Sequence, residues 1–295
     1  MILTTVPFQW NLLEPSRLVC NRELALLIDK KKEEALCRLV RKAGAAIVLD
    51  KARTSTVQWK ADESPVTSAD LAANDVIMMG LGILDPNIPI LSEESADIPY
   101  ETRKKWNSYY LVDPLDGTKG FIKGRKEYTV NIALIQNGTP IFGAVFCPER
   151  EELFYGAKGL GSFYVHENAP PLQLLVRTIS QTPPRIVGSL NHEASEMRAF
   201  LRRVGKHRFE QLGSSLKICQ VAQRKADIYP RFGPTSEWDT AAAHAVVLYA
   251  GGDVVSITGS PLRYNQKESL LNPHFFVLGP EDREWLAWAK AAYSP

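Results

Sequence analysis

The sequence contains no uninterrupted apolar run of about 18 residues, the length that a membrane-spanning helix needs. Its 4 cysteines are scattered without a Cys-x-x-Cys pair, which argues against a disulfide framework or a zinc site and favours buried free thiols. The N-terminus has no basic segment followed by a long apolar one, as a secretory signal would. We therefore expect a soluble protein of the cytoplasm with no integral membrane segment.

Neither sign of charge is in excess, since 35 Lys and Arg residues stand against 33 Asp and Glu residues. A formal net charge of +2 gives no reason to expect nucleic acid as a partner, although a local basic pocket for phosphate would not show in this sum. Hydrophobic residues at 45% and charged residues at 23% are typical of globular proteins and argue against a disordered or fibrous chain.

The length of 295 residues predicts one large layered domain or two packed subdomains. The Pro183-Pro184 pair marks a junction between a β-rich part and a part in which strands and helices alternate. We therefore divide the chain into an N-terminal extension, residues 1–29, an α+β subdomain, residues 30–183, and an α/β subdomain, residues 184–295.

Hydrophobic periodicity predicts the principal elements on both sides of this junction. Leu36, Leu39, Val40 and Ile47 are spaced as on one face of an amphipathic helix that begins at Lys30. Further helices are expected over residues 71–81, 193–203, 214–224, 238–250 and 282–292, and strands over residues 56–60, 88–91, 128–135, 140–146, 153–155, 162–165, 185–188, 227–229 and 275–278.

The most informative segment is Trp106–Lys119, an apolar run that stops at two acids. Its aromatic and β-branched residues predict a buried strand. Pro114 has no N–H to continue a central ladder, so we place Asp113 at the exit of the strand. Asp116 follows three positions later, which puts two carboxylates on one short loop.

This loop has the donor set that a hard cation prefers. The two carboxylates and the intervening carbonyl group of Leu115 are oxygen ligands suited to Mg²⁺. Gly117 and Thr118 follow, and their N–H groups at a helix start would point at an anion such as phosphate.

Structural explanations stay open for each acid taken alone. Asp116-Gly117 is also a common hairpin-turn dipeptide. Asp70 falls in the first turn of a helix capped by Ser68, where the helix dipole explains an acid, and Asp239 has the same place in a later helix. Glu93-Glu94 follows a short strand and would be ordinary on a surface. The shared pattern, acids at element boundaries, favours a common site.

Several ordered motifs extend this pattern: Ser64-Pro-Val-Thr-Ser-Ala-Asp70, Glu93-Glu94, Asp113-Pro-Leu-Asp-Gly-Thr118, Gly213-Ser-Ser-Leu-Lys217, Tyr229-Pro-Arg-Phe-Gly-Pro234, Trp238-Asp239-Thr-Ala-Ala and Glu268-Ser-Leu-Leu-Asn-Pro273. Together they resemble the inositol-monophosphatase-like superfamily of Mg²⁺- and Li⁺-responsive phosphatases, and within it the CysQ-type 3′(2′),5′-bisphosphate nucleotidases. The resemblance covers roughly residues 31–278. It implies an α/β protein of the α+β kind, folded as a layered αβαβα sandwich.

The resemblance also implies a site for two or three Mg²⁺ ions, with inhibition by Li⁺. Asp70 and Thr118 match the pair that, with Glu93, activates a metal-bound water for in-line attack on phosphorus, and Gly117 and Thr118 would bind the phosphate. The metal ligands that carry over are Glu93, Asp113, the carbonyl group of Leu115, Asp116 and Asp239.

Five residues resemble the groups that hold the nucleotide beyond the reacting phosphate: Gly213, Ser214, Ser215, Lys217 and Arg231. The alternative for Ser214-Ser215 is that they only cap the helix that follows, with Lys217 on its exposed face. Nucleotidases of this type usually show an acid after Asp-Gly-Thr-Lys, whereas this chain has Gly120. That departure bears on substrate preference more than on the reaction.

The resemblance thus implies a Mg²⁺-dependent phosphomonoesterase that converts adenosine 3′,5′-bisphosphate to AMP and phosphate, in support of sulfate assimilation. The sulfated form of this nucleotide is a further candidate substrate. Rival interpretations are an inositol or sugar phosphatase on the same scaffold and a non-catalytic sensor of Mg²⁺ or nucleotide. An aspartyl-phosphate mechanism is disfavoured because Asp113 and Asp116 lie three positions apart, not two. A monomer or homodimer, and peripheral association with the inner membrane, stay open.

Overall fold

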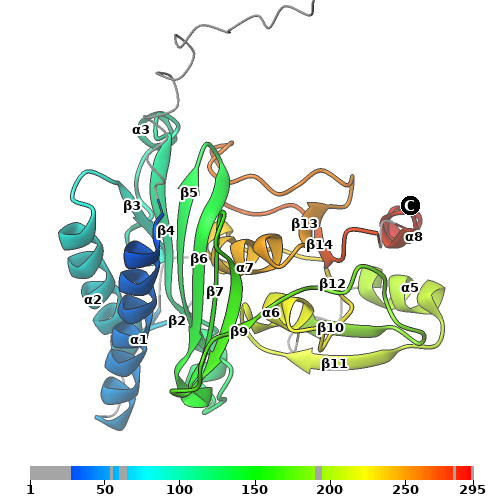
Figure 1. Ribbon diagram of the computed structural model, residues 1–295, viewed down its shortest axis with the longest axis horizontal. Coiled ribbons are helices and arrows are strands. Elements are labelled where there is room, and N and C mark those ends of the chain that lie inside the picture. Colours follow the sequence, from blue (N-terminus) through cyan, green and yellow to red (C-terminus); the bar gives the residue numbers. More distant parts are fainter. Residues whose placement is uncertain (1–27, 54–55, 60–64, 190–194, 282–283, 294–295) are drawn as a thin grey trace, which may run out of the picture.

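Two large β-sheets and the helices packed on them form the molecule (Figure 1). The computed structural model describes residues 28–53, 56–59, 65–189, 195–281 and 284–293. Nearly all of the expected N-terminal extension, residues 1–29, lies outside these ranges, as do Cys20 and Ser64.

The larger sheet has seven strands in the order β3-β4-β5-β6-β7-β8-β9, parallel between β3 and β4 and antiparallel elsewhere. The smaller sheet has five strands in the order β11-β10-β12-β14-β13, and β1 and β2 form a separate hairpin. The strands are β1 Val57–Trp59, β2 Pro65–Thr67, β3 Ile90–Ser92, β4 Ser108–Asp116, β5 Thr129–Gln136, β6 Thr139–Cys147, β7 Glu152–Ala157, β8 Gly161–His166, β9 Leu172–Gln173, β10 Arg185–Ser189, β11 Arg208–Leu212, β12 Ile228–Arg231, β13 Asp253–Ser256 and β14 Phe275–Leu278.

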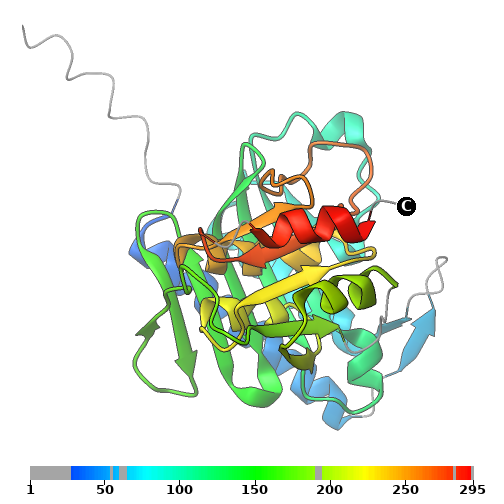
Figure 2. The same ribbon diagram turned by 90° about the vertical axis from the view of Figure 1, so that its right-hand side faces the viewer.

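Helices lie on both faces of each sheet and complete five layers (Figure 1). Helices α1 and α2 cover the outer face of the seven-stranded sheet, α6 and α7 lie between the sheets, and α5 and α8 cover the outer face of the five-stranded sheet (Figure 2). The helices are α1 Lys30–Ala52, α2 Ser68–Leu84, α3 Tyr100–Arg103, α4 Thr118–Ile122, α5 Ser195–Val204, α6 Leu216–Ala222, α7 Glu237–Tyr249 and α8 Glu284–Tyr293. The expected αβαβα sandwich is confirmed.

The sequence of β4 is apolar on both faces because each face of the strand is covered by a core. Tyr109 and Leu111 belong to the core between the sheets, whereas Tyr110 and Val112 belong to the core under α1 and α2. Side chains alternate between the two faces of a strand, so a strand covered on both sides needs a continuous apolar run. The same alternation turns the next odd residue, Asp113, toward the layer that contains α7.

Helix α7 comes unusually close to the seven-stranded sheet because two strand residues have no side chain. A Cβ atom at Gly143 would lie 2.1 Å from the carbonyl oxygen of Ala242, and one at Gly156 would lie 2.8 Å from that of Ala245. The alanines of α7 are buried against these strands. This close packing fixes the N-terminal turn of α7 beside the end of β4.

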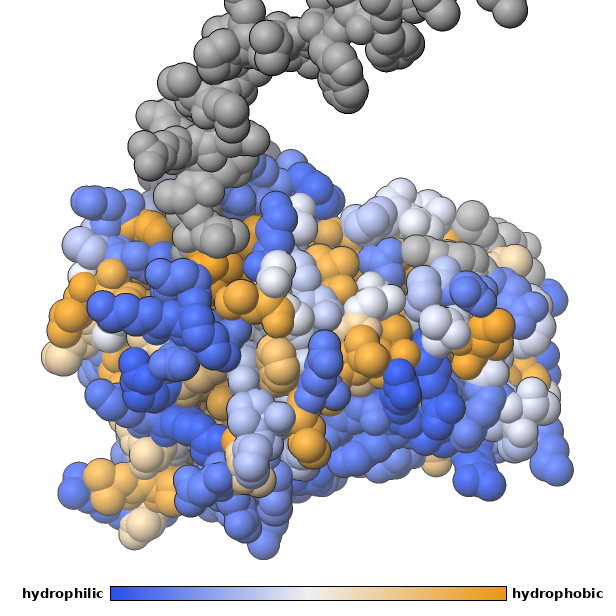
Figure 3. Space-filling model, viewed as in Figure 1, coloured by the Kyte–Doolittle hydropathy of each residue, from blue (hydrophilic) through white to orange (hydrophobic). Residues whose placement is uncertain are grey.

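The surface is of mixed character. On the face drawn in Figure 3, hydrophilic residues predominate and smaller apolar patches interrupt them. Met79 and Ile83 of α2 are the most exposed of the large apolar side chains, at 70% and 78%. None of the described helices combines the length and the hydropathy that a bilayer crossing requires.

Candidate active site

Strand β4 carries the first two acids, and it runs further than the sequence predicts. We expected the strand to end at Asp113, but β4 continues through Pro114 to Asp116. The pairing with β5 shifts register between Asp113, opposite Asn131, and Asp116, opposite Thr129. The irregularity removes the need for a ladder N–H at the proline, which is why the prediction was wrong.

The same irregularity holds both carboxylates on one side of the strand end. The N–H of Leu115 donates to Oδ1 of Asp113 at 3.0 Å, which fixes that carboxylate against its own backbone. Asp113 is buried, with 1% of its surface exposed, and Asp116 is half-buried. Asp116-Gly117 is not a hairpin turn, because Gly117, with φ of 98°, leads directly into α4.

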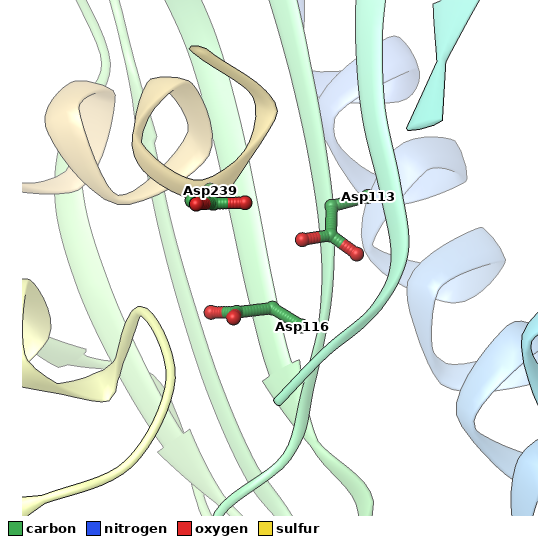
Figure 4. A group of neighbouring side chains, drawn as sticks. All are labelled: Asp113, Asp116 and Asp239. Atoms are coloured by element: carbon green, nitrogen blue, oxygen red, sulfur yellow. The ribbon is translucent and has the colours of Figure 1, made fainter. Parts of the chain in front are cut away.

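The third acid comes from the first turn of α7, as predicted. Ser236 is the N-cap residue, and its N–H donates to Oδ2 of Asp239 at 2.9 Å. This capping arrangement leaves the other carboxylate oxygen of Asp239 directed at the end of β4 (Figure 4).

The structure brings Asp113, Asp116 and Asp239 together, with one oxygen of each within 4.8 Å of the others (Figure 4). Burial, then the charges of Glu93, Asp116 and Asp239, raise the pKa of Asp113 well above its usual range. Burial and the charges of Asp116 and Glu93 raise the pKa of Asp239 in the same way. Three crowded carboxylates that repel one another form a donor set that a hard divalent cation fits, because it supplies the missing positive charge.

Two further predicted ligands lie beside this cluster. Glu93 begins the 3₁₀ turn after β3 and lines the same cavity as Asp116 and Asp239, although its carboxylate is not one of the three that are mutually close. Its charge nevertheless acts on Asp113 and Asp239, so it belongs to the same electrostatic unit. The carbonyl oxygen of Leu115 lies 3.1 Å from the Thr118 hydroxyl oxygen.

Asp70 and Thr118 meet although they lie 48 positions apart in sequence. The Thr118 hydroxyl donates to Oδ1 of Asp70 at 3.1 Å, while Oδ2 accepts from the N–H and the hydroxyl of Thr67 at 2.9 and 2.5 Å. Thr67, not the expected Ser68, is therefore the N-cap residue of α2. Ser68 instead donates to Asp50 at 2.7 Å, a contact invisible in the local sequence.

A cavity of about 310 Å³ opens over these acids. Gly213, Ser214, Ser215, Lys217 and Arg231, the residues predicted to hold the nucleotide, all line it. Ser215 is the N-cap residue of α6, as the helix-cap alternative expects. Its hydroxyl oxygen, however, lies 2.9 Å from Oδ1 of Asn131 and 2.9 Å from the hydroxyl oxygen of Thr129.

The two cations of this wall differ in their surroundings. Lys217 is buried, not on an exposed helix face, and burial lowers its pKa to about 8 although the charge of Asp116 opposes the shift. Its ammonium group donates to the carbonyl oxygen of Ser214 and lies 5.7 Å from the ring of Tyr229. Arg231 is also buried, and its guanidinium donates to the carbonyl oxygen of Pro234 at 2.7 Å. Two basic groups thus face a set of acids across one cavity.

Comparison with known proteins agrees with this geometry. The family model described as "Inositol monophosphatase family" matches residues 29–289. The chain belongs to the inositol monophosphatase family.

Relatives within this family are more specific. The chain is 48% identical over 247 residues to the 3′(2′),5′-bisphosphate nucleotidase CysQ of Escherichia coli K12, covering 83% of this chain and 98% of that protein. It is 35% identical to the CysQ nucleotidase of Haemophilus influenzae, covering 78% of this chain and 86% of that protein.

Solved structures agree with these sequence matches. CysQ from Bacteroides thetaiotaomicron superposes with a TM-score of 0.74 at 35% identity, covering 86% of this chain and 98% of that one. Thermotoga maritima IMPase has the same TM-score at 22% identity, covering 89% and 98%, and shows the shared fold alone.

Sequence reasoning missed the buried network that supports the start of α7 in this member of the family. Arg103 donates to Asn265, to the carbonyl oxygen of Lys267 at 3.2 Å and to that of Glu268. Asn265 donates through its N–H to Glu237 at 2.7 Å. Burial raises the pKa of Glu237 to about 7. Glu237 directly precedes the Trp238-Asp239 motif, and this position was the one indication of the network in the sequence.

Proposed function

We propose that this protein is a Mg²⁺-dependent phosphomonoesterase that hydrolyses the 3′-phosphate of adenosine 3′,5′-bisphosphate to AMP and phosphate. The observation that carries the proposal is one cavity lined by Asp116 and Asp239, two of the three clustered aspartates, and by two buried basic side chains, Lys217 and Arg231. The bisphosphate nucleotidases to which the chain is similar support the choice of substrate. Removal of this by-product would serve sulfate assimilation in the cytoplasm.

In this proposal the acids form the cation site. Asp113, Asp116 and Asp239 would hold Mg²⁺, with Glu93 and the carbonyl group of Leu115 as further ligands. Bound there, Mg²⁺ supplies positive charge that stabilises the phosphate in the transition state and lowers the pKa of water. The raised pKa values of Asp113 and Asp239 support this assignment, because their causes are burial and the charges of neighbouring carboxylates, both of which a bound cation would offset.

Asp70 and Thr118 would orient the attacking water. The carboxylate of Asp70 is fixed by Thr67, and the Thr118 hydroxyl can donate only one proton, to Asp70 or to the carbonyl oxygen of Leu115, both at 3.1 Å. When that proton goes to Asp70, the hydroxyl oxygen keeps a lone pair free to accept a hydrogen bond from water. The carboxylate can then take up the proton that the water loses.

The substrate would bind along the wall opposite. The N–H groups of Gly117 and Thr118, at the start of α4, have no carbonyl group within that helix to bind, so they suit phosphate oxygens. Ser214, Ser215, Lys217 and Arg231 would hold the nucleotide beyond the reacting phosphate, with Gly213 allowing the chain to approach it closely. Two cations here favour a substrate with more than one anionic group.

The test is phosphate release from adenosine 3′,5′-bisphosphate and from inositol 1-phosphate, measured side by side with Mg²⁺ and with EDTA. The proposal expects turnover that requires Mg²⁺, favours the nucleotide and is inhibited by Li⁺. A preference for the polyol phosphate would leave the reaction standing and reject the substrate. Tight binding of either compound without turnover would identify a sensor, and a trapped phosphoenzyme would reject direct attack by water.

A further inference from the structure

Helix α4 and the turn after it form one wall of the cavity. In this wall the absence of a side chain at Gly120 leaves Arg125 uncovered. Gly120 and Arg125 both line the cavity, and the N–H of Arg125 donates to the carbonyl oxygen of Gly120 at 2.9 Å. A Cβ atom at Gly120 would lie 3.7 Å from the Cβ and Cδ atoms of Arg125, an ordinary van der Waals contact. Gly120 is a helical residue without left-handed backbone, so the fold does not require glycine here. Its effect is to leave the side chain of Arg125 open to the cavity.

Arg125 is half-buried, and its guanidinium has no hydrogen-bond or ion-pair partner within the described ranges. The nearest acid along the chain, Glu127, also lines the cavity but is paired with Arg150, whose Nη2 lies 2.9 Å from Oε1 of Glu127. Lys217 and Arg231, by contrast, each donate to a carbonyl oxygen of their own wall. Arg125 is the one of these three cations whose side chain makes no hydrogen bond to a described residue, although Nε of Arg231 is also without a partner.

The turn that carries Arg125 contacts the segment that we assign to the nucleotide. A Cβ atom at Gly213 would lie 3.0 Å from the Cβ and 3.2 Å from the carbonyl oxygen of Glu127, so the turn that carries Arg125 packs on the start of the segment 213–217. The three clustered aspartates come from β4 and α7 instead.

We propose that Arg125 is a specificity-determining residue that binds the anionic group the substrate retains, the 5′-phosphate of a nucleoside 3′,5′-bisphosphate. This inference rests on the proposed function. A guanidinium stays protonated at every physiological pH, and its planar fork matches two phosphate oxygens. An acid at position 120 would contact Arg125 and pair with it, so Gly120 keeps the arginine available for the substrate.

The experiment compares kcat/KM for adenosine 3′,5′-bisphosphate with kcat/KM for adenosine 3′-phosphate, which has no second phosphate. In Arg125→Gln the ratio of the two values falls about 10- to 100-fold, mainly through a higher KM for the bisphosphate. Lys123→Gln is the matched control, because it removes the same charge from an exposed neighbour that is not among the described lining residues, and it leaves the ratio within about two-fold. An Arg125→Gln ratio within that same range overturns the inference.

Gly120→Glu tests, with Arg125 still present, whether the absence of an acid at position 120 keeps the arginine available. The new carboxylate lowers the ratio about as much as Arg125→Gln does. The neutral Gly120→Gln lowers the ratio less. Combining Gly120→Glu with Arg125→Gln adds little further loss. A Gly120→Glu ratio equal to that of the parent protein overturns the inference. Failure of the proposed function looks different, because the parent protein itself would then prefer inositol 1-phosphate or turn over no bisphosphate.

Discussion

The backbone N–H of Ser215 donates a hydrogen bond to Oδ2 of Asp116 at 2.5 Å, across 99 positions of sequence. This contact joins the acid at the end of β4 to the segment that we assign to the nucleotide. The charge of Lys217 and this hydrogen bond both act to lower the pKa of Asp116, although burial prevails and raises it. The cation site and the substrate wall are therefore one mechanical and electrostatic unit.

Gly213→Ala should disturb this unit without removing any of its hydrogen bonds. The added methyl group would lie 3.0 Å from the side chain of Glu127 and 3.2 Å from its carbonyl oxygen, so the segment up to Ser215 must shift. We expect kcat to fall by about 10-fold or more, because small misplacements in an active site are costly. Gly82→Ala is the matched control, since nothing lies within 4 Å of its added methyl group.

The measurement is the rate of phosphate release at saturating substrate, together with the melting temperature of each variant. A Gly213→Ala protein with the kcat of the parent would show that the contact between Ser215 and Asp116 does not hold the site in register.

Asp116→Asn should abolish most of the turnover while the fold persists. The asparagine oxygen can still accept from the N–H of Ser215, so the local geometry has a replacement partner. The lost charge weakens the cation site, and we expect kcat to fall ~10²-fold or more. Asp75→Asn, on the exposed face of α2, is the control and should keep the activity of the parent. Near-normal turnover of Asp116→Asn would remove this residue from the site.

Thr118→Val removes the hydroxyl that reaches Asp70 at 3.1 Å and keeps the shape of the side chain. If this hydroxyl orients water, kcat should fall about 10²-fold while KM stays near that of the parent, and Thr118→Ser should restore most of the loss. The check is steady-state kinetics on adenosine 3′,5′-bisphosphate. A variant in which KM rises and kcat does not change would assign Thr118 to binding only.

The predictable part of the molecule is the part encoded by local patterns. The aromatic and apolar run Tyr109–Val112 predicted a buried strand, and the place of Asp239 in a first helical turn predicted the start of α7. Both features are confirmed because each follows from a few adjacent residues. Strands β2, β9, β11 and β13 were missed. Strand β11 is mostly exposed and begins Arg-Phe-Glu, without an apolar face.

What the sequence could not supply was contact between distant segments. The register shift between Asp113 and Asp116 depends on pairing with β5, and the donor to Asp116 comes from Ser215. The cap of α2 was misassigned because Ser68 bonds to Asp50 on another helix. The roles of the individual site residues stay predictions, which the variants described here address.

The acidic cluster predicts a pH dependence of stability that Mg²⁺ weakens. In the metal-free protein the pKa values of Asp113 and Asp239 are raised well above the usual 3.8 of the carboxyl group. The folded state then binds more protons than the unfolded state, so this contribution to stability is full at low pH and is lost as pH rises through the folded pKa values. With EDTA, the melting temperature should therefore fall as pH rises above 3.8 through the raised pKa values of these two carboxyl groups.

Mg²⁺ and protons compete for the same oxygens, so stabilisation by the cation should grow as pH rises. At a concentration roughly 100-fold above its Kd, the cation would stabilise the folded state by about 3 kcal/mol. Thermal unfolding at several pH values, with Mg²⁺ and with EDTA, measures both trends. Asp116→Asn relieves part of the repulsion on Asp113 and Asp239, so its melting temperature in EDTA should depend less on pH. A parent protein whose Mg²⁺-induced shift is the same at pH 5.5 and pH 8, to within about 1 °C, would contradict the assignment of these acids as a single cation site.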